Sequence, residues 1–258
     1  MNPELAALAL AAARDAAAAA ADVIRHYWQR GVEVELKADA TPVTVADREA
    51  ERAIRKILQA ALPQASIYGE EFGLDGERGG LLWLVDPLDG TKSFVRRTPF
   101  FSTQIALMEG DELVLGVSSA PIYGETMWAS LGGGAWLDGE RARVADTEAI
   151  EQASLSIGNV RTLTADARWG ALGALIRDSN RIRGYGDFCH YHLLARGSLD
   201  LVIESDVNIL DIAALAVIVR EAGGVFTDLD GAPLTPDTRS VLAGTPAIHA
   251  QALQRLRC

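Results

Sequence analysis

The feature that most constrains the fold is a continuous apolar run at residues 81–85, which ends at Asp86 and Pro87. A run without alternation is typical of a strand buried on both faces, so we expect structural layers on both sides of one sheet. Asp86 and Asp89 then lie at an edge of that sheet, where ligands of α/β folds collect. Two carboxylates so close together repel each other unless a positive charge lies between them. The segment therefore predicts a site for a hard divalent cation such as Mg²⁺, which takes oxygen ligands.

Gly90 and Thr91 follow directly and begin a short predicted helix. Glycine allows a backbone to approach a ligand closely, and the free N–H groups at a helix start suit a phosphate. The alternative is an ordinary turn, since Asp, Pro and Gly are common turn residues.

Three further carboxylates follow or begin other predicted elements. Glu70 comes after a short strand, Asp47 lies in the first turn of a helix, and Asp211 opens an apolar helix. Each has a second interpretation: the pair Glu70 and Glu71 is typical of a solvated surface, and Asp is among the best helix N-caps. A cap can also be a ligand, so capping does not exclude Asp47 or Asp211 from a site.

The order of elements predicts an α/β protein of two closely packed halves, residues 1–145 and 146–258. In the first half a long helix precedes a short strand that breaks at Thr41 and Pro42, and a meander of strands comes last. The second half alternates strands and helices. The main predicted ranges are helices 3–30, 44–62, 166–177, 188–196 and 211–222, strands 32–36, 66–69, 81–85, 153–157, 182–185, 199–204, 225–227 and 241–243, and a meander over 100–144.

The charge balance argues against nucleic-acid and anionic-membrane partners. The 35 acidic residues outnumber the 24 basic ones, which gives a net charge of −11, and such partners attract basic surfaces. The alanine-rich N-terminal segment contains Arg14 and Asp15, which disfavour a membrane span. Because no targeting segment is evident, we expect a cytoplasmic protein.

Cysteine and histidine give weaker signals. Cys189 and Cys258 lie far apart and form no CxxC motif, so neither a disulfide framework nor a cysteine-built zinc site is expected. His190 and His192 could bind a transition metal, but an incidental pair near a helix is the interpretation that we prefer.

Four segments, taken in chain order, resemble the inositol monophosphatase superfamily over nearly the whole length. They are KADATPVTVAD at 37–47, GEE at 69–71, DPLDGTKSF at 86–94, and DIAA at 211–214 with EAGG at 221–224. One departure is Leu210, where the family usually has Trp, and there we expect altered packing without loss of metal binding.

The resemblance implies a layered αβαβα sandwich, in which an α+β half and an α/β half meet at the active site, and a homodimer. It implies a phosphatase of small phosphate monoesters that uses two or three Mg²⁺ ions. The implied metal ligands are Glu70, Asp86, the backbone carbonyl of Leu88, Asp89 and Asp211. Thr91 with Glu70, and Asp47 through contact with Thr91, would activate the attacking water, and the N–H groups of Gly90 and Thr91 would hold the phosphate.

The second half is similar to the histidinol-phosphate phosphatase branch, through Gly186-Asp187-Phe188 with Tyr191 and through Phe-Val-Arg at 94–96. Carboxylates such as Asp187 and Glu204 would suit the cationic leaving group of that substrate. Asp187 could instead cap a helix, and Arg183 could form a structural salt bridge. The implied substrate-binding residues are Leu88, Asp89, Gly90, Thr91, Arg183, Asp187, Glu204 and Asp211.

L-Histidinol phosphate is therefore the first substrate hypothesis, and inositol 1-phosphate or a broad range of sugar-alcohol monophosphates is the alternative. Bisphosphate nucleotidases and fructose bisphosphatases need further basic groups, for which only Arg181 and Arg183 are candidates. A non-catalytic binding protein on the same fold is the remaining alternative, and the intact acidic positions argue against it.

Overall fold

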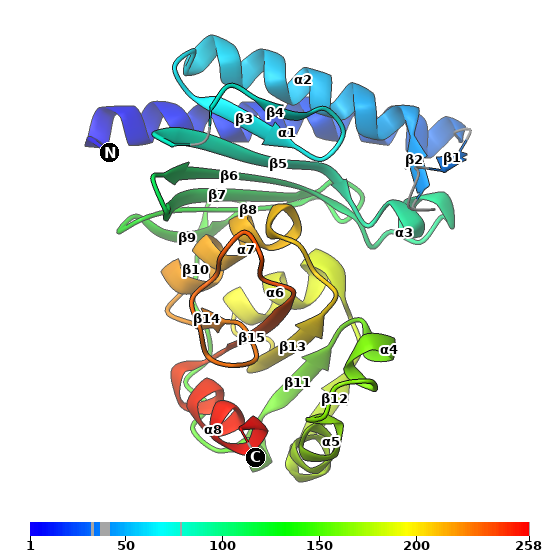
Figure 1. Cartoon of the computed structure of the whole chain (residues 1–258), viewed down its shortest axis with the longest axis vertical. Helices are drawn as coiled ribbons and strands as arrows, with labels where there is room; N and C mark the ends of the chain where they lie inside the picture. Colours follow the sequence, from blue (N-terminus) through cyan, green and yellow to red (C-terminus); the bar gives the residue numbers. More distant parts are fainter. Residues whose placement is uncertain (32–33, 37–41, 78, 258) are drawn as a thin grey trace.

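The computed structural model describes residues 1–31, 34–36, 42–77 and 79–257, and it stacks them in five layers (Figure 1). Helices α1 (Pro3–Arg30) and α2 (Val45–Ala61) cover one face of an eight-stranded sheet. Helices α6 (Asp187–Ala195) and α7 (Ile209–Glu221) separate it from a five-stranded sheet, whose outer face carries α5 (Trp169–Asp178) and α8 (Pro246–Leu256). The predicted α/β sandwich is confirmed.

The first sheet has the strand order β10-β9-β8-β7-β6-β5-β3-β4. Only β3 and β5 pair in parallel, and the strands after residue 100 form the predicted meander. Its strands are β3 (Ser66–Gly69), β4 (Gly73–Asp75), β5 (Leu81–Asp89), β6 (Ser102–Glu109), β7 (Glu112–Ala120), β8 (Glu125–Ser130), β9 (Gly134–Leu137) and β10 (Glu140–Ala142).

The prediction that the buried strand stops at Asp86 is wrong. β5 continues to Asp89, with an irregularity in its pairing to β6 between Asp86 and Asp89. After Pro87 the pairing with β6 resumes at Asp89, which lies opposite Ser102. The irregularity is what places both aspartates at one end of the strand.

The second sheet has the order β12-β11-β13-β15-β14. Its strands are β11 (Ser154–Ile157), β12 (Arg181–Arg183), β13 (Leu201–Ser205), β14 (Val225–Thr227) and β15 (Ser240–Gly244). A separate strand pair consists of β1 (Val34–Leu36) and β2 (Pro42–Thr44). The short helices are α3 (Thr91–Val95), a 3-10 turn (Ile150–Gln152) and α4 (Val160–Leu163).

Three sequence predictions need correction or lie outside these ranges. The helix predicted from residue 166 begins at Trp169, and the unpredicted α4 precedes it. Pro42 opens β2 rather than only ending a strand. Residues 32–33, Thr41 and Cys258 lie outside the described residues, as do residues 37–41 at the start of the first resemblance segment.

Alanine determines how the outer layer packs. The face of α1 that meets α2 and the sheet consists mainly of alanines, including Ala9, Ala13, Ala16 and Ala20, none of which is exposed. Small side chains allow close approach, and alanine is the best helix former. Among the described residues, no helix combines the length and the apolar character that a bilayer span requires.

The middle layer depends on a close approach between α7 and the first sheet. A Cβ atom at Gly116 of β7 would lie 2.4 Å from the Ala214 backbone oxygen of α7. Helix α7 is apolar around its whole circumference, as expected for a helix buried between two sheets. Its N-terminus therefore reaches the end of β5 in a defined position.

Candidate active site

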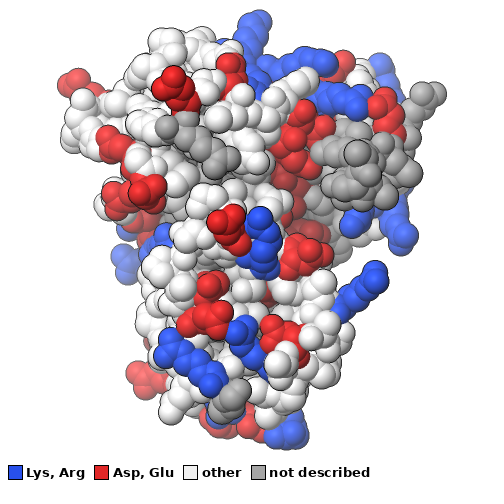
Figure 2. All heavy atoms as spheres, viewed as in Figure 1, with Lys and Arg blue, Asp and Glu red and all other residues white. Residues whose placement is uncertain are grey.

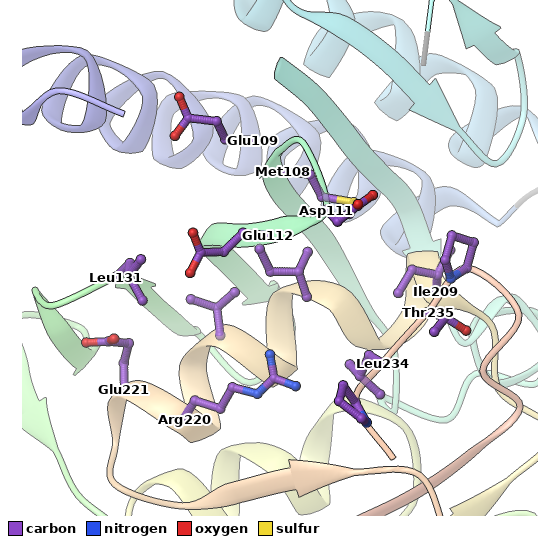
Figure 3. Close-up of a pocket in the computed structure, with 14 residues that line it drawn as sticks. Met108, Glu109, Asp111, Glu112, Leu131, Ile209, Arg220, Glu221, Leu234 and Thr235 are labelled. Atoms are coloured by element: carbon purple, nitrogen blue, oxygen red, sulfur yellow. The ribbon is translucent and has the colours of Figure 1, made fainter. Parts of the chain in front are cut away.

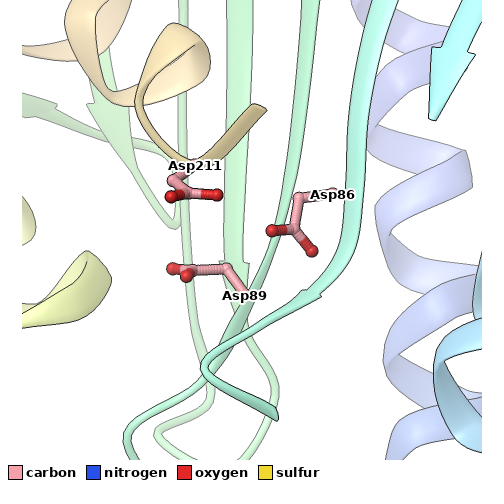
Figure 4. Close-up of side chains that lie close together, drawn as sticks. All are labelled: Asp86, Asp89 and Asp211. Atoms are coloured by element: carbon pink, nitrogen blue, oxygen red, sulfur yellow. The ribbon is translucent and has the colours of Figure 1, made fainter. Parts of the chain in front are cut away.

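Three aspartates from two layers converge at the end of β5. Asp86 and Asp89 come from β5 and Asp211 from the first turn of α7, and their side chains point toward one another (Figure 4). One carboxylate oxygen from each lies within 4.8 Å of the others. The structure thus brings together three of the residues predicted as metal ligands.

Burial and mutual repulsion make this cluster unfavourable in its charged form. Burial, followed by the charges of Glu70, Asp89 and Asp211, raises the pKa of Asp86 well above its ordinary value. Burial likewise raises the pKa of Asp89, and it raises that of Asp211 to about 7. Carboxylates arranged in this way need protons or a cation to be neutralised.

The donor atoms of the cluster fit a hard divalent cation. Every ligand that the three aspartates offer is a carboxylate oxygen, which is the donor that Mg²⁺ prefers. The Leu88 backbone lies between the two β5 aspartates, and its N–H donates to Asp86 Oδ1 at 2.9 Å. Among the described residues, the histidines and the cysteine contribute no group of metal ligands.

Glu70 lies beside this cluster because β3 is parallel to β5. Its backbone N–H donates to the Val85 carbonyl at 3.1 Å, one residue before Asp86. Its charge raises the pKa values of Asp86, Asp89 and Asp211. The predicted neighbourhood of Glu70 and the aspartates is therefore present.

Asp47 contacts Thr91, as the resemblance implied. Thr91 Oγ1 lies 3.0 Å from Asp47 Oδ1 and 3.1 Å from the Leu88 carbonyl oxygen. The other Asp47 oxygen accepts from the Thr44 N–H at 2.8 Å and the Thr44 hydroxyl at 2.6 Å. Burial raises the pKa of Asp47, while these donors stabilise its charged form.

Neither Asp47 nor Asp211 is an N-cap residue, which corrects the capping interpretation. Thr44 caps α2 and Asn208 caps α7, and each aspartate is the third helical residue of a capping box. In this arrangement the aspartate accepts a hydrogen bond from the N-cap backbone. Both helices thus hold a site aspartate by the same local device.

Gly90 occupies a position that other residues fill poorly. Its φ is +89°, and an added Cβ would lie 2.6 Å from the Phe100 carbonyl oxygen. It precedes Thr91 at the start of the short helix α3.

A second acidic group adjoins the aspartate cluster. Asp89, Asp187, Glu204 and Asp211 line one small pocket. Burial, followed by the charge of Glu204, raises the pKa of Asp187 to about 6. The alternative interpretation of Asp187 as a helix cap is wrong, because Gly186 is the N-cap residue of α6 and no side chain caps this helix. The Asp187 carboxylate instead contributes negative charge to the pocket.

Two side chains of α6 hold the Glu204 carboxylate through one of its two oxygens. Its Oε2 accepts from Tyr191 OH at 2.7 Å and lies 3.1 Å from His190 Nε2. Its Oε1 lies beside Gly158, where an added Cβ would come within 2.1 Å. His190 also lies 3.3 Å from Ser156 Oγ through Nδ1.

Some residues are placed differently from the sequence interpretation. His190 and His192 have separate buried partners, but His190 supports Glu204 and so belongs to the site, as does Asn159 in the same pocket. A histidine one residue before Tyr191 was the available signal. Arg183 is exposed, donates to the Ile182 carbonyl at 2.7 Å, and lines a different hollow.

Leu210 shows how the chain accommodates its departure from the family pattern. It is 5% exposed and packs in a cluster with Leu84, Ala106 and Ala213. Asp211 still faces Asp86 and Asp89 (Figure 4).

A wide hollow of about 810 Å³ lies elsewhere, along α7 and the β6–β7 turn (Figure 3). Apolar side chains such as Leu131 and Leu234 line it together with the carboxylates of Glu109 and Glu221. Glu221 already accepts from the Gly132 and Gly134 N–H groups. This hollow contains none of the converging aspartates.

The surface carries mixed charge on the face shown in Figure 2, where acidic and basic side chains are interspersed among the described residues.

Comparison with known proteins agrees with this geometry. The model of the inositol monophosphatase family matches residues 7–258. The chain is 38% identical to a histidinol-phosphatase of Streptomyces coelicolor, over 92% of this chain and 91% of the relative. It is 40% identical to a histidinol-phosphatase of Mycobacterium tuberculosis, over 86% and 87%.

A solved structure has the same fold. The extragenic suppressor protein suhB from Bartonella henselae superposes with a TM-score of 0.88 at 30% identity, over 96% of this chain and 98% of that one. The aspartate cluster, the five-layer fold and these matches lead to one conclusion: the chain belongs to the inositol monophosphatase family of phosphoric monoester hydrolases, and histidinol-phosphatases are among its relatives.

Proposed function

We propose that the protein is a Mg²⁺-dependent phosphomonoesterase that hydrolyses L-histidinol phosphate to L-histidinol and phosphate. The observation that carries the substrate choice is the acidic group of Asp187 and Glu204 beside the aspartate cluster. Histidinol has an ammonium group and an imidazole that can be protonated, so its phosphate ester presents positive charge to these carboxylates. The two histidinol-phosphatase relatives support the same choice.

The proposed metal ligands are the clustered carboxylates with one backbone carbonyl. Two or three Mg²⁺ ions would be held by Glu70, Asp86, the carbonyl oxygen of Leu88, Asp89 and Asp211. When bound, the ions offset the charge of the phosphate and lower the pKa of water.

The side chains of the chain itself orient the reactants. Asp47 accepts from the Thr91 hydroxyl at 3.0 Å, and Thr91 and Glu70 orient the attacking water. The proton that this water loses passes to Thr91 Oγ1 as the Thr91 proton moves to Asp47 Oδ1. The water oxygen forms the new bond to phosphorus as the ester P–O bond breaks in line, and the leaving alkoxide takes up a proton from solvent to become L-histidinol. The N–H groups of Gly90 and Thr91 hold phosphate oxygens.

The leaving group lies in the pocket of the second half. His190 and Tyr191 both contact Glu204 through Oε2, whereas Oε1 faces Gly158. Asp187 has no capping role and presents its carboxylate to the same pocket. A cation there restores the charged form of Asp187, whose pKa of about 6 reflects burial and the charge of Glu204.

The test compares phosphate release from L-histidinol phosphate and inositol 1-phosphate with Mg²⁺. We expect a higher kcat/KM for histidinol phosphate, and a fall of roughly tenfold or more for that substrate alone in Asp187→Asn and Glu204→Gln. Asp237→Asn, at an exposed loop carboxylate, is the charge-matched control. Equal turnover of both substrates would refute the pocket argument, and no turnover of either would refute the phosphatase.

An inositol or sugar-alcohol phosphate is the second candidate. Asn159 lines the same pocket, and Thr162 Oγ1 lies 2.6 Å from Ser205 Oγ nearby, so neutral polar groups could bind a polyol. A preference for inositol 1-phosphate that Asn159→Ala abolishes would favour this assignment.

We also propose a cytoplasmic homodimer in which halves 1–145 and 146–258 each contribute to the site. Family membership supports the homodimer. The division into halves is supported by the two sheets, because the last strand of the first sheet ends at Ala142 and the first strand of the second sheet begins at Ser154. Light scattering would measure the subunit number, and a monomeric mass would contradict the dimer.

A further inference from the structure

A row of hydrogen-bonded, buried polar side chains leads from Asp89 of the aspartate cluster to His192 of α6. It begins at Asp89 Oδ2, which lies 3.4 Å from Ser102 Oγ, and Ser102 Oγ lies 2.7 Å from Gln104 Nε2. The same nitrogen lies 3.1 Å from Ser118 Oγ, and this hydroxyl lies 2.8 Å from His192 Nε2. Ser102, Gln104, Ser118 and His192 are all at most 1% exposed.

The far end of this row is anchored at the surface. His192 Nδ1 lies 3.4 Å from Glu125 Oε2, and the other Glu125 oxygen accepts from Arg196 Nη1 at 2.9 Å. The series therefore has a carboxylate at each end, Asp89 inside and Glu125 outside. Between them are two hydroxyls, one amide and one imidazole.

Strand register explains why these residues form one row. Gln104 lies opposite Asp86 on one neighbouring strand and opposite Ser118 on the other, and Ser102 lies opposite Asp89. Residues directly opposite one another project from the same face of a sheet. This face meets α6, so His192 can reach Ser118.

The two terminal carboxylates determine the direction of every hydrogen bond. Glu125 only accepts, so His192 donates to it from Nδ1, and burial lowers the pKa of His192, which keeps the ring neutral. His192 Nε2 therefore accepts from the Ser118 hydroxyl, as Asp89 accepts from the Ser102 hydroxyl. Both serine oxygens must then accept, and the two N–H bonds of the Gln104 amide supply both donors.

The amide carbonyl of Gln104 is left over. Its Oε1 is buried without a hydrogen-bond partner among the described residues. A buried acceptor without a partner lowers the stability of the folded state, so the position is unfavourable for stability alone. Such a residue calls for an explanation in function.

We propose that Gln104 is a positioning residue that holds Asp89 through Ser102, so that Asp89 Oδ2 is tied to the sheet and Oδ1 is left for the metal ion. The inference rests on the proposed metal-dependent function. Hydrogen bonds that orient a metal-binding carboxylate typically account for 10–100-fold in metal affinity. The unpartnered carbonyl of Gln104 lowers the stability of the fold, while its amide N–H fixes the orientation of the Asp89 side chain through Ser102.

The test is Gln104→Met, which keeps the shape of the side chain and removes both the amide donors and the unpartnered carbonyl. Mg²⁺ titration by calorimetry on the otherwise metal-free full chain should show roughly tenfold weaker binding. The Tm without metal should be unchanged or higher, because the buried orphan acceptor is gone. Ser102→Ala should weaken Mg²⁺ binding to a similar extent.

Ser119→Ala is the matched control. Ser119 is also a buried serine of β7, but it is adjacent to Ser118 and lies 3.4 Å from Thr126 Oγ1 instead. Its Mg²⁺ affinity should equal that of the unsubstituted protein. Turnover of Gln104→Met should recover at saturating Mg²⁺, whereas turnover of Asp89→Asn should not.

Two failures are distinguishable. If the unsubstituted protein does not bind Mg²⁺, the proposed function is wrong. If it binds Mg²⁺ but Gln104→Met and Ser102→Ala bind within twofold of it, or if Gln104→Met lowers the Tm and leaves the affinity unchanged, Gln104 is only structural and the inference is overturned.

Discussion

At the scale of single residues, the acidic pocket of Asp187 and Glu204 depends on a glycine, Gly158. Glu204 is buried between His190 and Tyr191 on one side and Gly158 on the other. A Cβ at Gly158 would lie 2.1 Å from Glu204 Oε1 and 2.7 Å from its carboxyl carbon. Gly158 is therefore required for the position of Glu204.

We expect Gly158→Ala to displace the Glu204 carboxylate and to raise KM for the cationic substrate roughly tenfold, about 1.4 kcal/mol. Mg²⁺ affinity should change little, because Glu204 is not among the converging aspartates. Steady-state kinetics and calorimetry measure the two effects separately.

Gly173→Ala is the matched control, since an added Cβ there meets nothing within 4 Å and the residue lies inside α5. It should leave KM unchanged and stabilise the fold by about 1 kcal/mol. An unchanged KM in Gly158→Ala would contradict the role of this glycine.

At the scale of elements, α7 places Asp211 by two independent means. Its capping box orients the carboxylate locally, with Asn208 N–H donating to Asp211 Oδ2 at 3.0 Å. Its contact with Gly116 sets the distance of the whole helix from the first sheet, which carries Asp86 and Asp89.

We therefore expect Gly116→Ala to push α7 away from β7, because the new Cβ would meet backbone atoms of Ala214 at 2.4 and 2.7 Å. Overpacking of this kind costs about 1–3 kcal/mol, and the shift of Asp211 should also weaken Mg²⁺ binding. Denaturant unfolding and Mg²⁺ titration check both effects. A destabilised variant with normal affinity would show that α7 can move without disturbing the cluster.

At the scale of the whole molecule, the site lies where three layers meet. β5 belongs to the first sheet, α6 and α7 to the middle layer, and β13, which carries Glu204, to the second sheet. Folding gathers Asp86, Asp89, Asp187 and Asp211 against their electrostatic repulsion. The stability of the molecule should therefore depend on protons and on cations.

We expect the Tm of the metal-free protein to rise as the pH falls from about 8 to about 5.5. The pKa values of Asp211, about 7, and Asp187, about 6, are raised above their ordinary value. Between the ordinary pKa of each group and its raised pKa, the folded state binds more protons than the unfolded state. The free energy of unfolding therefore increases as the pH decreases. This stability is lost as the pH rises through 6 to 7.

Mg²⁺ should raise the Tm most at pH 8, where it replaces protons, and least at acidic pH. Calorimetric scans with Mg²⁺ or a chelator measure this, and Asp211→Asn should flatten both dependences. A metal-free Tm that falls on acidification would contradict the expectation.

The sequence by itself determined the elements and most of the acidic cluster. Periodicity located most of the helices and strands, although not β4 or α4, and ordered motifs placed Asp86, Asp89 and Asp211 at element ends. This succeeded because burial patterns and strand-end carboxylates are local properties.

Only the tertiary structure decided the rest. The continuation of β5 past Pro87 depends on its pairing with Ser102, and the role of His190 depends on Glu204, which lies fourteen residues away on another element. Gln104 joins Ser102 to Ser118 through strand register alone. Contacts between distant elements leave no periodic signal in the chain, because each partner taken alone is an ordinary polar residue.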